Sequence, residues 1–123
     1  MALGLTGKDS DLEQNFNYLL NGLMKKILGK GSASTEIYFL ANMILVKTSG
    51  ILTTQEKFLL NKNEGGDLIK NYRCKALEAG QQYIISEIKN SLEMIHIEDI
   101  YYDINVQKDT AIMVLTLKGS LND

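Results

Sequence analysis

Two stretches of this sequence alternate apolar with polar residues, and a short turn interrupts each of them. In the first, from Glu36 to Ser49, Ile37 and Phe39 alternate with polar neighbours before Ala41-Asn42 breaks the pattern. A period of two is typical of a half-buried β-strand, and asparagine tolerates the left-handed backbone that a tight turn needs. The first stretch therefore predicts a β-hairpin that turns at Ala41-Asn42, and the absence of a glycine leaves the turn type open.

The second alternating stretch lies later in the chain. Its apolar positions are Ile100, Tyr102, Ile104 and Val106, and its polar positions are Tyr101, Asp103 and Asn105. The polar run Gln107-Lys108-Asp109-Thr110 predicts a turn into the apolar run Ala111 to Leu117, and thus a second hairpin. Both faces of this last run are apolar until Thr116, and Met43 to Val46 shows the same pattern. We therefore expect the sheet to be covered on both sides.

Capping boxes indicate two helix starts. Ser10 stands three residues before Glu13, and Thr53 stands three residues before Glu56. In this spacing the hydroxyl accepts a free backbone N–H while the carboxylate reaches back to the cap. We predict one helix from Ser10 to Gly29 and a short helix that starts at Thr53.

A long helical pattern follows a turn from Asn61 to Gly66. Apolar residues recur at steps of three and four from Asp67, which can cap this helix, to about Leu92. Gly80 interrupts the pattern without ending it, and close packing there would offset the conformational cost of a glycine. A helix of about 26 residues is roughly 39 Å long, whereas a sheet of about four strands is only roughly 19 Å wide. We expect part of this helix to overhang the domain.

The predicted order of elements is α-β-β-α-α-β-β. This order places the chain in the α+β class, with a four-stranded, mainly antiparallel sheet, helices packed on one face and one long helix at about 67–92. We expect one domain over residues 10–119 after a flexible N-terminus at residues 1–9. A second copy is the simplest cover for the overhanging helix and the two-faced strands, so the sequence predicts a homodimer.

Charge and composition argue against several classes of function. Thirteen basic and fifteen acidic side chains give a net charge of −2, which offers no positive surface for nucleic acid. No run approaches the roughly 18 apolar residues of a membrane span, so we expect a soluble, cytoplasmic protein without direct membrane insertion. One cysteine, Cys74, and one histidine, His96, are too few for a zinc site or a Cys-His pair. We predict no metal, no cofactor and no catalytic residue.

Four polar residues could anchor a small ligand in a pocket between the sheet and the helices. They are Glu56, Arg73, Asp99 and Asp103. Arg73 could hold a carboxylate or a phosphate in a bidentate fork. Each residue also has a structural explanation, since Glu56 can cap a helix, Arg73 can lie on a helix face, and the two aspartates can belong to a solvated strand face.

Three segments resemble the MpsC domain family, named for the Na+-translocating membrane potential-generating system. They are LGKGSASTEIYFLANMILVKTSGILTTQEKFLL, EGGDLIKNYRCKALEAGQQYIISEI and IHIEDIYYDIN. The resemblance covers about residues 11 to 118. Its most specific elements are the Gly50-Ile51-Leu52-Thr53 step with Glu56, the helix entry from Glu64 to Arg73, and the late Asp103-Ile104 strand.

The resemblance implies a small soluble protein associated with a membrane system for cation translocation or inorganic-carbon uptake. It does not imply that this chain itself conducts ions. The sequence departs from the family pattern at Gly31-Ser32-Ala33, where members tend to carry Arg-Gly-Pro, and at Tyr102, where a small polar residue is more usual.

Two functions are consistent with these observations. The first is a non-catalytic accessory or regulatory homodimer that acts by protein–protein interaction, for example on a membrane-associated complex. The second is a small-ligand-binding sensor or enzyme whose pocket lies between the sheet and the helices. We favour the first hypothesis, because the sequence contains no catalytic motif.

Overall fold

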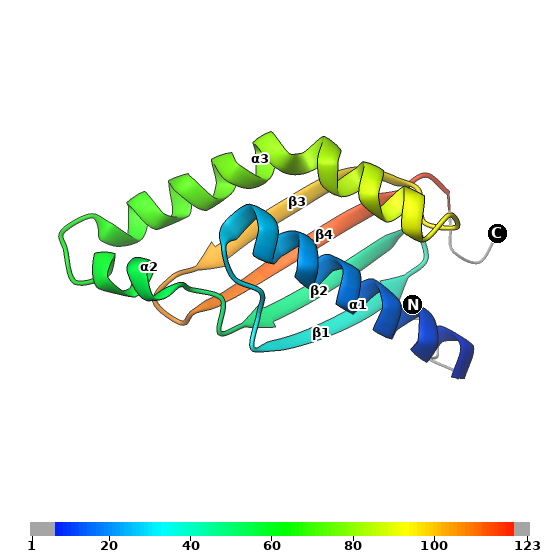
Figure 1. Cartoon of the computed structure of the whole chain (residues 1–123), viewed down its shortest axis with the longest axis horizontal. Helices are drawn as coiled ribbons and strands as arrows, with labels where there is room; N and C mark the ends of the chain where they lie inside the picture. Colours follow the sequence, from blue (N-terminus) through cyan, green and yellow to red (C-terminus); the bar gives the residue numbers. More distant parts are fainter. Residues whose placement is uncertain (1–6, 120–123) are drawn as a thin grey trace.

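A computed structural model of the chain describes residues 7–119 and shows the predicted order of elements (Figure 1). The elements are α1 (Gly7–Leu28), β1 (Ser34–Leu40), β2 (Met43–Ser49), α2 (Thr54–Leu59), α3 (Gly65–Ser91), β3 (Ile97–Asn105) and β4 (Thr110–Leu117). The α+β class is thereby confirmed, including the single long helix. Residues 1–6, which we predicted to be flexible, lie outside the described residues.

The four strands form one antiparallel sheet in the order β1-β2-β4-β3. The first hairpin turns at the predicted place, because its register pairs Leu40 with Met43 around a two-residue loop. The residue with a left-handed backbone is Ala41, with φ of 42°, and not Asn42, although asparagine tolerates that conformation better. The register makes Ala41 the first loop residue, the position at which tight hairpin turns need a positive φ.

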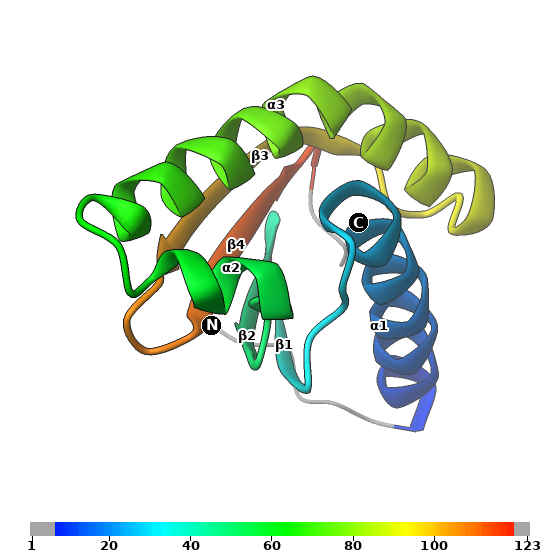
Figure 2. The ribbon, with the colours of Figure 1, turned by 60° about the vertical axis from the view of Figure 1, so that its left-hand side comes forward.

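Helices α1 and α3 pack on one face of the sheet (Figure 2), where they enclose the main hydrophobic core. Fully buried members include Phe16 of α1, Ile84 and Ile88 of α3, and Ile44 and Leu115 of the central strands. The close packing predicted at Gly80 is confirmed, since a Cβ there would lie 2.9 Å from Cδ1 of Ile27. Glycine thus lets α1 approach α3 closely.

Two predicted helix starts are wrong. Helix α1 begins at Gly7, three residues before Ser10. Helix α3 begins at Gly65, so Asp67 lies within its first turn, where a negative charge favours the helix dipole, and does not cap it. Gly65 is required by sterics, because a Cβ there would lie 1.7 Å from the carbonyl oxygen of Leu59. The close contact between the start of α3 and the end of α2, and not a side-chain cap, therefore sets the residue at which α3 begins.

The start of α3 extends beyond the ends of the strands, and α2 of the same chain packs against this part (Figure 1). A second, smaller core fills this end of the molecule, with Ile51, Leu52, Ile69, Ile104 and Ala111 buried. The chain itself therefore covers one side of the overhang, whereas Phe58, Leu68 and Tyr72 remain 71%, 56% and 57% exposed on the other. Helix α1 also projects beyond the sheet. In both views its N-terminal end extends past β1, the strand at the edge (Figures 1 and 2).

Within the described chain, helices cover only one face of the sheet. The apolar pattern of the strands had predicted that both faces would be covered. The uncovered side, which we call the open face, carries the side chains that alternate with the buried ones. One cross-strand row on it consists of Tyr38, Leu45, Val114 and Tyr101, one from each strand in sheet order. We call these four residues the open-face row.

Candidate functional site

The predicted residues Glu56 and Arg73 form a buried ion pair. Nε of Arg73 donates to Oε2 of Glu56 over 2.8 Å, and Nη2 donates to Oε1 over 2.7 Å. Arg73 is 1% exposed and Glu56 is 7% exposed. Such a two-point contact joins the planar guanidinium to the carboxylate with defined geometry, so the pair fixes α2 against α3.

Local sequence explains how each partner reaches this contact. Thr53 caps α2 in the predicted capping box, where its hydroxyl accepts the N–H of Glu56 over 3.1 Å, and its own N–H donates to Oε1 of Glu56 over 2.8 Å. Arg73 lies on the buried stripe of α3, four residues after Ile69 and four before Leu77. One carboxylate therefore completes a helix cap and neutralises a buried cation.

The same arrangement holds the segment between β2 and α2, residues 50–53, which we call the 50–53 segment. Nη2 of Arg73 donates to the carbonyl oxygen of Ile51 over 2.7 Å. From the loop after β3, Oδ1 of Asp109 accepts the N–H groups of Ile51 and Leu52, each over 2.8 Å. From the loop after α1, Nζ of Lys30 donates to the carbonyl oxygen of Leu52 over 3.2 Å. Side chains thus satisfy these buried backbone groups.

The environment keeps both members of the pair charged. Burial by itself would raise the pKa of the Glu56 carboxyl, but hydrogen bonds from Arg73 and Thr53 outweigh it and hold that pKa below its ordinary value of 4.5. Burial would lower the pKa of Arg73, yet the hydrogen bonds of Glu56 and the neighbouring Tyr102 leave it raised. Burial raises the pKa of Tyr102, and Arg73 only partly offsets this effect. An ionised carboxylate with both oxygens engaged is a poor general base.

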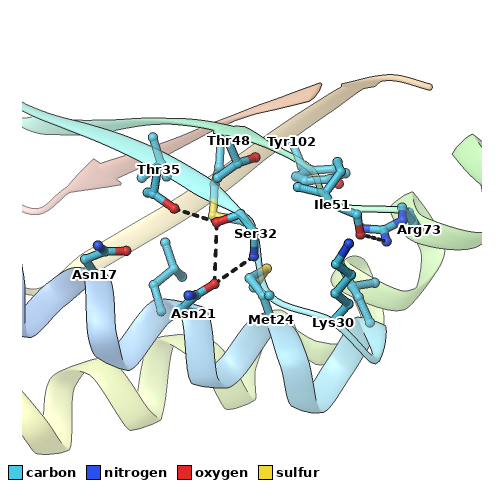
Figure 3. A pocket seen from close by; sticks show the side chains of 15 residues that line it. Asn17, Asn21, Met24, Lys30, Ser32, Thr35, Thr48, Ile51, Arg73 and Tyr102 are labelled. Carbon is cyan, nitrogen blue, oxygen red and sulfur yellow. Dashed lines mark hydrogen bonds between the residues drawn. The ribbon is translucent and has the colours of Figure 1, made fainter. Parts of the chain in front are cut away.

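A narrow pocket lies beside this pair, between α1 and the sheet (Figure 3). Its polar lining includes Asn17, Asn21, Ser32, Thr35, Thr48 and, at the inner end, Arg73 and Tyr102. Oδ1 of Asn21 accepts the N–H of Ser32 over 2.9 Å, and the hydroxyl of Ser32 is hydrogen-bonded to that of Thr35. The cavity measures about 30 Å³. That volume admits one or two water molecules, whereas pockets for drug-sized ligands measure about 300 to 1,000 Å³.

The other two predicted ligand residues lie elsewhere. Asp99 and Asp103 are exposed on the edge strand β3, where Asp99 accepts a hydrogen bond from Gln81 over 3.1 Å and Asp103 pairs with Lys70 at 3.3 Å. The structure therefore brings Glu56 and Arg73 together and leaves the two aspartates outside that site.

Two members of the site, Lys30 and Asp109, were not predicted from the sequence. Asp109 takes a left-handed φ of 54° in the turn between β3 and β4. Aspartate in a turn is a recognisable signal, but the backbone groups it accepts lie 57 and 58 residues earlier in the chain. Within residues 7–119, no group of three or more His, Cys, Asp or Glu side chains is placed to hold a metal ion.

The open face is the second candidate site. Tyr101 is 60% exposed, Ile112 is 44% exposed and Tyr38 is 38% exposed. Leu45 and Val114 are half-buried between the two tyrosines of the open-face row. Tyrosine side chains combine a large apolar surface with a polar tip, and they are enriched at protein interfaces. The arrangement offers contact area for a macromolecule, beside a wide hollow of about 470 Å³ that Glu36, Lys47 and Asp103 help to line.

None of the described helices is both long enough and apolar enough to cross a membrane.

Comparison with known proteins places these features in context. A family model described as "Na+-translocating membrane potential-generating system (MpsC)" matches residues 8–119. YbcI of Bacillus subtilis (strain 168) is 30% identical over 100 residues, which cover 79% of this chain and 77% of YbcI. YrhF of the same organism is 21% identical over 108 residues, which cover 88% of each chain. Both relatives are named as uncharacterized proteins, and no solved structure matches significantly.

Proposed function

Because the chain belongs to the MpsC family, we propose that it is a non-catalytic accessory protein that acts through protein–protein contacts. In this proposal it works in the cytoplasm as a homodimer. Its partner is a protein of a membrane system for cation translocation, as the family description suggests, or for inorganic-carbon uptake. The open-face row is the observation that carries the proposal.

The open face has the composition expected of a contact surface. Its centre is the row of two tyrosines around Leu45 and Val114, which crosses all four strands. Charged residues follow in the next row, where Glu36 pairs across the strands with Lys47. An apolar centre with a polar margin is the usual anatomy of a protein interface, and exposed apolar patches mark interaction sites.

The buried pair supports a non-catalytic role. The carboxylate of Glu56 is engaged by Arg73 and Thr53, and Nη2 of Arg73 also bonds the carbonyl of Ile51. A group committed to internal hydrogen bonds must break them before it can bind a substrate. These contacts give the pair a structural role in fixing the 50–53 segment.

Co-purification tests the contact with the membrane system. The chain would be co-expressed with membrane proteins of such a system from an organism that encodes both, and captured from a detergent extract. We expect the membrane proteins to be retained by the wild type and lost with Val114→Lys, because a lysine in the open-face row places a charge at its apolar centre. Tyr18→Lys is the matched control, since Tyr18 is 86% exposed on α1. Equal retention by the wild type and Val114→Lys would contradict the open face as the contact.

Light scattering over a dilution series tests the homodimer. We expect the mass of two chains at micromolar concentration and a fall toward one chain on dilution. A single-chain mass at every concentration up to the solubility limit would overturn the dimer. Co-purification would then still test the accessory role.

The alternative function is a small-ligand-binding sensor or enzyme. It is supported by the pocket between α1 and the sheet, whose inner end contains Arg73. Its small volume restricts a ligand to a few atoms unless side chains move. Saturable binding of a small anion that is lost in Arg73→Lys, with the fold retained, would favour this alternative over the first proposal.

A further inference from the structure

The outer side of α1 carries a glycine that no contact within the described chain explains. Gly22 is exposed in the interior of α1, and beyond its chain neighbours and the adjoining helix backbone no described atom lies within 4 Å of the position that a Cβ would take there. Gly80 of α3 differs, since Ile27 packs against it. Glycine destabilises a helix interior relative to alanine. Packing within the chain therefore gives a reason for Gly80 and none for Gly22.

A wide hollow of about 880 Å³ lies over this side of α1, and we call it the α1 hollow. Its floor includes Tyr18, Gly22, Lys25 and Lys26, whose spacing of four, seven and eight residues from Tyr18 places them on one face of the helix. Tyr18 is 86% exposed. Side chains of α3, which lies beside α1 (Figures 1 and 2), and of the loop after α1 complete the lining. The unexplained glycine thus lies at the bottom of an open surface hollow.

The α1 hollow is positively charged. Three lysines line it, Lys25, Lys26 and Lys30, together with one carboxylate, Glu87. None of the three lysines forms an ion pair with a described side chain. Nζ of Lys26 donates to the hydroxyl of Tyr83 over 2.9 Å and lies 5.4 Å from the centre of its ring, which fixes this ammonium group beside α3. Acidic side chains outnumber basic ones in the whole chain, so the positive charge is local to this surface.

We propose that the α1 hollow binds an extended acidic segment of a partner polypeptide, with the carboxylates of that segment against the lysines and its backbone close to Gly22. Ammonium and carboxylate groups form charge-assisted hydrogen bonds, and the missing side chain of a glycine lets a second backbone approach closely. Because α1 packs on the sheet face opposite to the open face, this inference goes beyond the proposed function. It adds a second contact surface and does not depend on the homodimer.

The shape of the α1 hollow favours a polypeptide over other anions. Its α1 lining extends from Gln14 to Lys26, which is roughly 18 Å of helix. An extended chain covers that length with about five residues, whereas a single phosphate group would contact only the end with the lysines. A membrane surface is flat and does not reach the floor of a hollow. The helix dipole accounts for lysines in the last turn of α1, but it accounts for neither Tyr18 nor Gly22.

Fluorescence anisotropy with a labelled peptide of eight glutamates tests the charge, at low salt where surface electrostatics are strongest. We expect the wild type to bind this peptide and not its glutamine counterpart. Lys25→Glu combined with Lys26→Glu should raise the dissociation constant at least tenfold. Lys57→Glu combined with Lys62→Glu, a matched control at exposed lysines of α2 and the turn after it, should change it less than threefold. Equal weakening by the two pairs, or no binding by the wild type, would overturn the proposal.

Gly22→Leu tests the close approach, because it should change stability and binding in opposite directions. Leucine favours a helix more than glycine does, and the Cβ position is open, so the thermal unfolding midpoint should rise. The same side chain fills the floor of the α1 hollow, so we expect the dissociation constant of the glutamate peptide to rise at least fivefold. Asn71→Leu, at an exposed position near the start of α3, is the control and should leave binding unchanged. A stabilised Gly22→Leu chain that binds like the wild type would overturn the contact at Gly22.

Vesicles that contain phosphatidylglycerol distinguish a polypeptide from a membrane surface. Vesicle binding that is lost in the Lys25→Glu, Lys26→Glu chain and unaffected by Gly22→Leu would assign the lysines to lipid and overturn the proposal. Peptide binding without vesicle binding supports it. Neither result bears on the proposed function, whose tests are the dilution series and Val114→Lys on the open face. The Tyr18→Lys control in that co-purification keeps the positive charge of the α1 hollow and leaves the open face unchanged.

Discussion

The 50–53 segment and the open face both border the sheet, yet they differ in how far the chain covers them. In the 50–53 segment, Arg73, Asp109 and Lys30 supply side-chain partners for the buried backbone groups. On the open face, no described helix packs on the open-face row, and Tyr101 stays 60% exposed. Among the described residues, the chain thus closes the first region and leaves the second uncovered, so internal stability and association depend on different parts of the molecule.

The largest predicted effect comes from breaking the closed region at Arg73. Arg73→Met leaves Glu56 buried without its cation, and removing one member of a buried pair costs about 3–5 kcal/mol. We expect the free energy of unfolding in urea to fall by about that amount. Lys70→Met on the same helix is the control, since Lys70 is half-exposed in its pair with Asp103. A loss below about 1 kcal/mol in Arg73→Met would show that the pair does not hold this region.

Glu56→Gln gives a smaller effect with a characteristic pH dependence. The folded pKa of Glu56 lies below its ordinary value of 4.5, so its contribution is complete above that value and is lost as pH falls through the lower folded pKa. We expect the variant to lose about 1.5–3 kcal/mol of unfolding free energy at pH 7.

Below pH 4 the difference between wild type and Glu56→Gln should shrink, because acid protonates the wild-type carboxylate. Urea unfolding from pH 7 to pH 3 measures this convergence. A difference that stays constant over this range would contradict an ionised Glu56 as the source of the stability.

Asp109 tests the other side of the same segment. Asp109→Ala leaves the N–H groups of Ile51 and Leu52 without their acceptor, and it places alanine at a φ of 54°. We expect a loss of about 1–3 kcal/mol. Asp109→Asn keeps an oxygen acceptor and tolerates the left-handed backbone, so it should retain most of the stability. Equal losses in both variants would assign the effect to charge and not to the hydrogen bonds.

The smallest effect is predicted at strand β1, away from the 50–53 segment. Thr35→Ala should change the unfolding free energy by about 1 kcal/mol or less, since only one partly exposed hydroxyl contact to Ser32 is lost. Thermal unfolding measures this change. A large loss would show that this hydroxyl contact holds the fold as strongly as the contacts of the 50–53 segment do.

Much of the fold and part of the site follow from patterns within short stretches of the sequence. The capping box at Thr53 and Glu56 and the hairpin turn at residues 41–42 depend on neighbours a few positions apart, and both were predicted from spacing. Arg73 and Glu56 were both named as polar anchors, but their mutual contact spans 17 positions and was not predicted. Asp109 was missed, because its role depends on a segment more than 50 residues earlier.

The sequence by itself determined the order of elements, the two hairpins and the long helix, because periodicity and short-range capping act within one element. Only the tertiary structure decided that α2 packs against the overhanging start of α3, that the aspartates of β3 lie away from Glu56, and that no described helix covers one face of the sheet. These outcomes depend on the strand order β1-β2-β4-β3. Sheet order and the packing of helices on one face are set by contacts between distant residues, which no local pattern encodes.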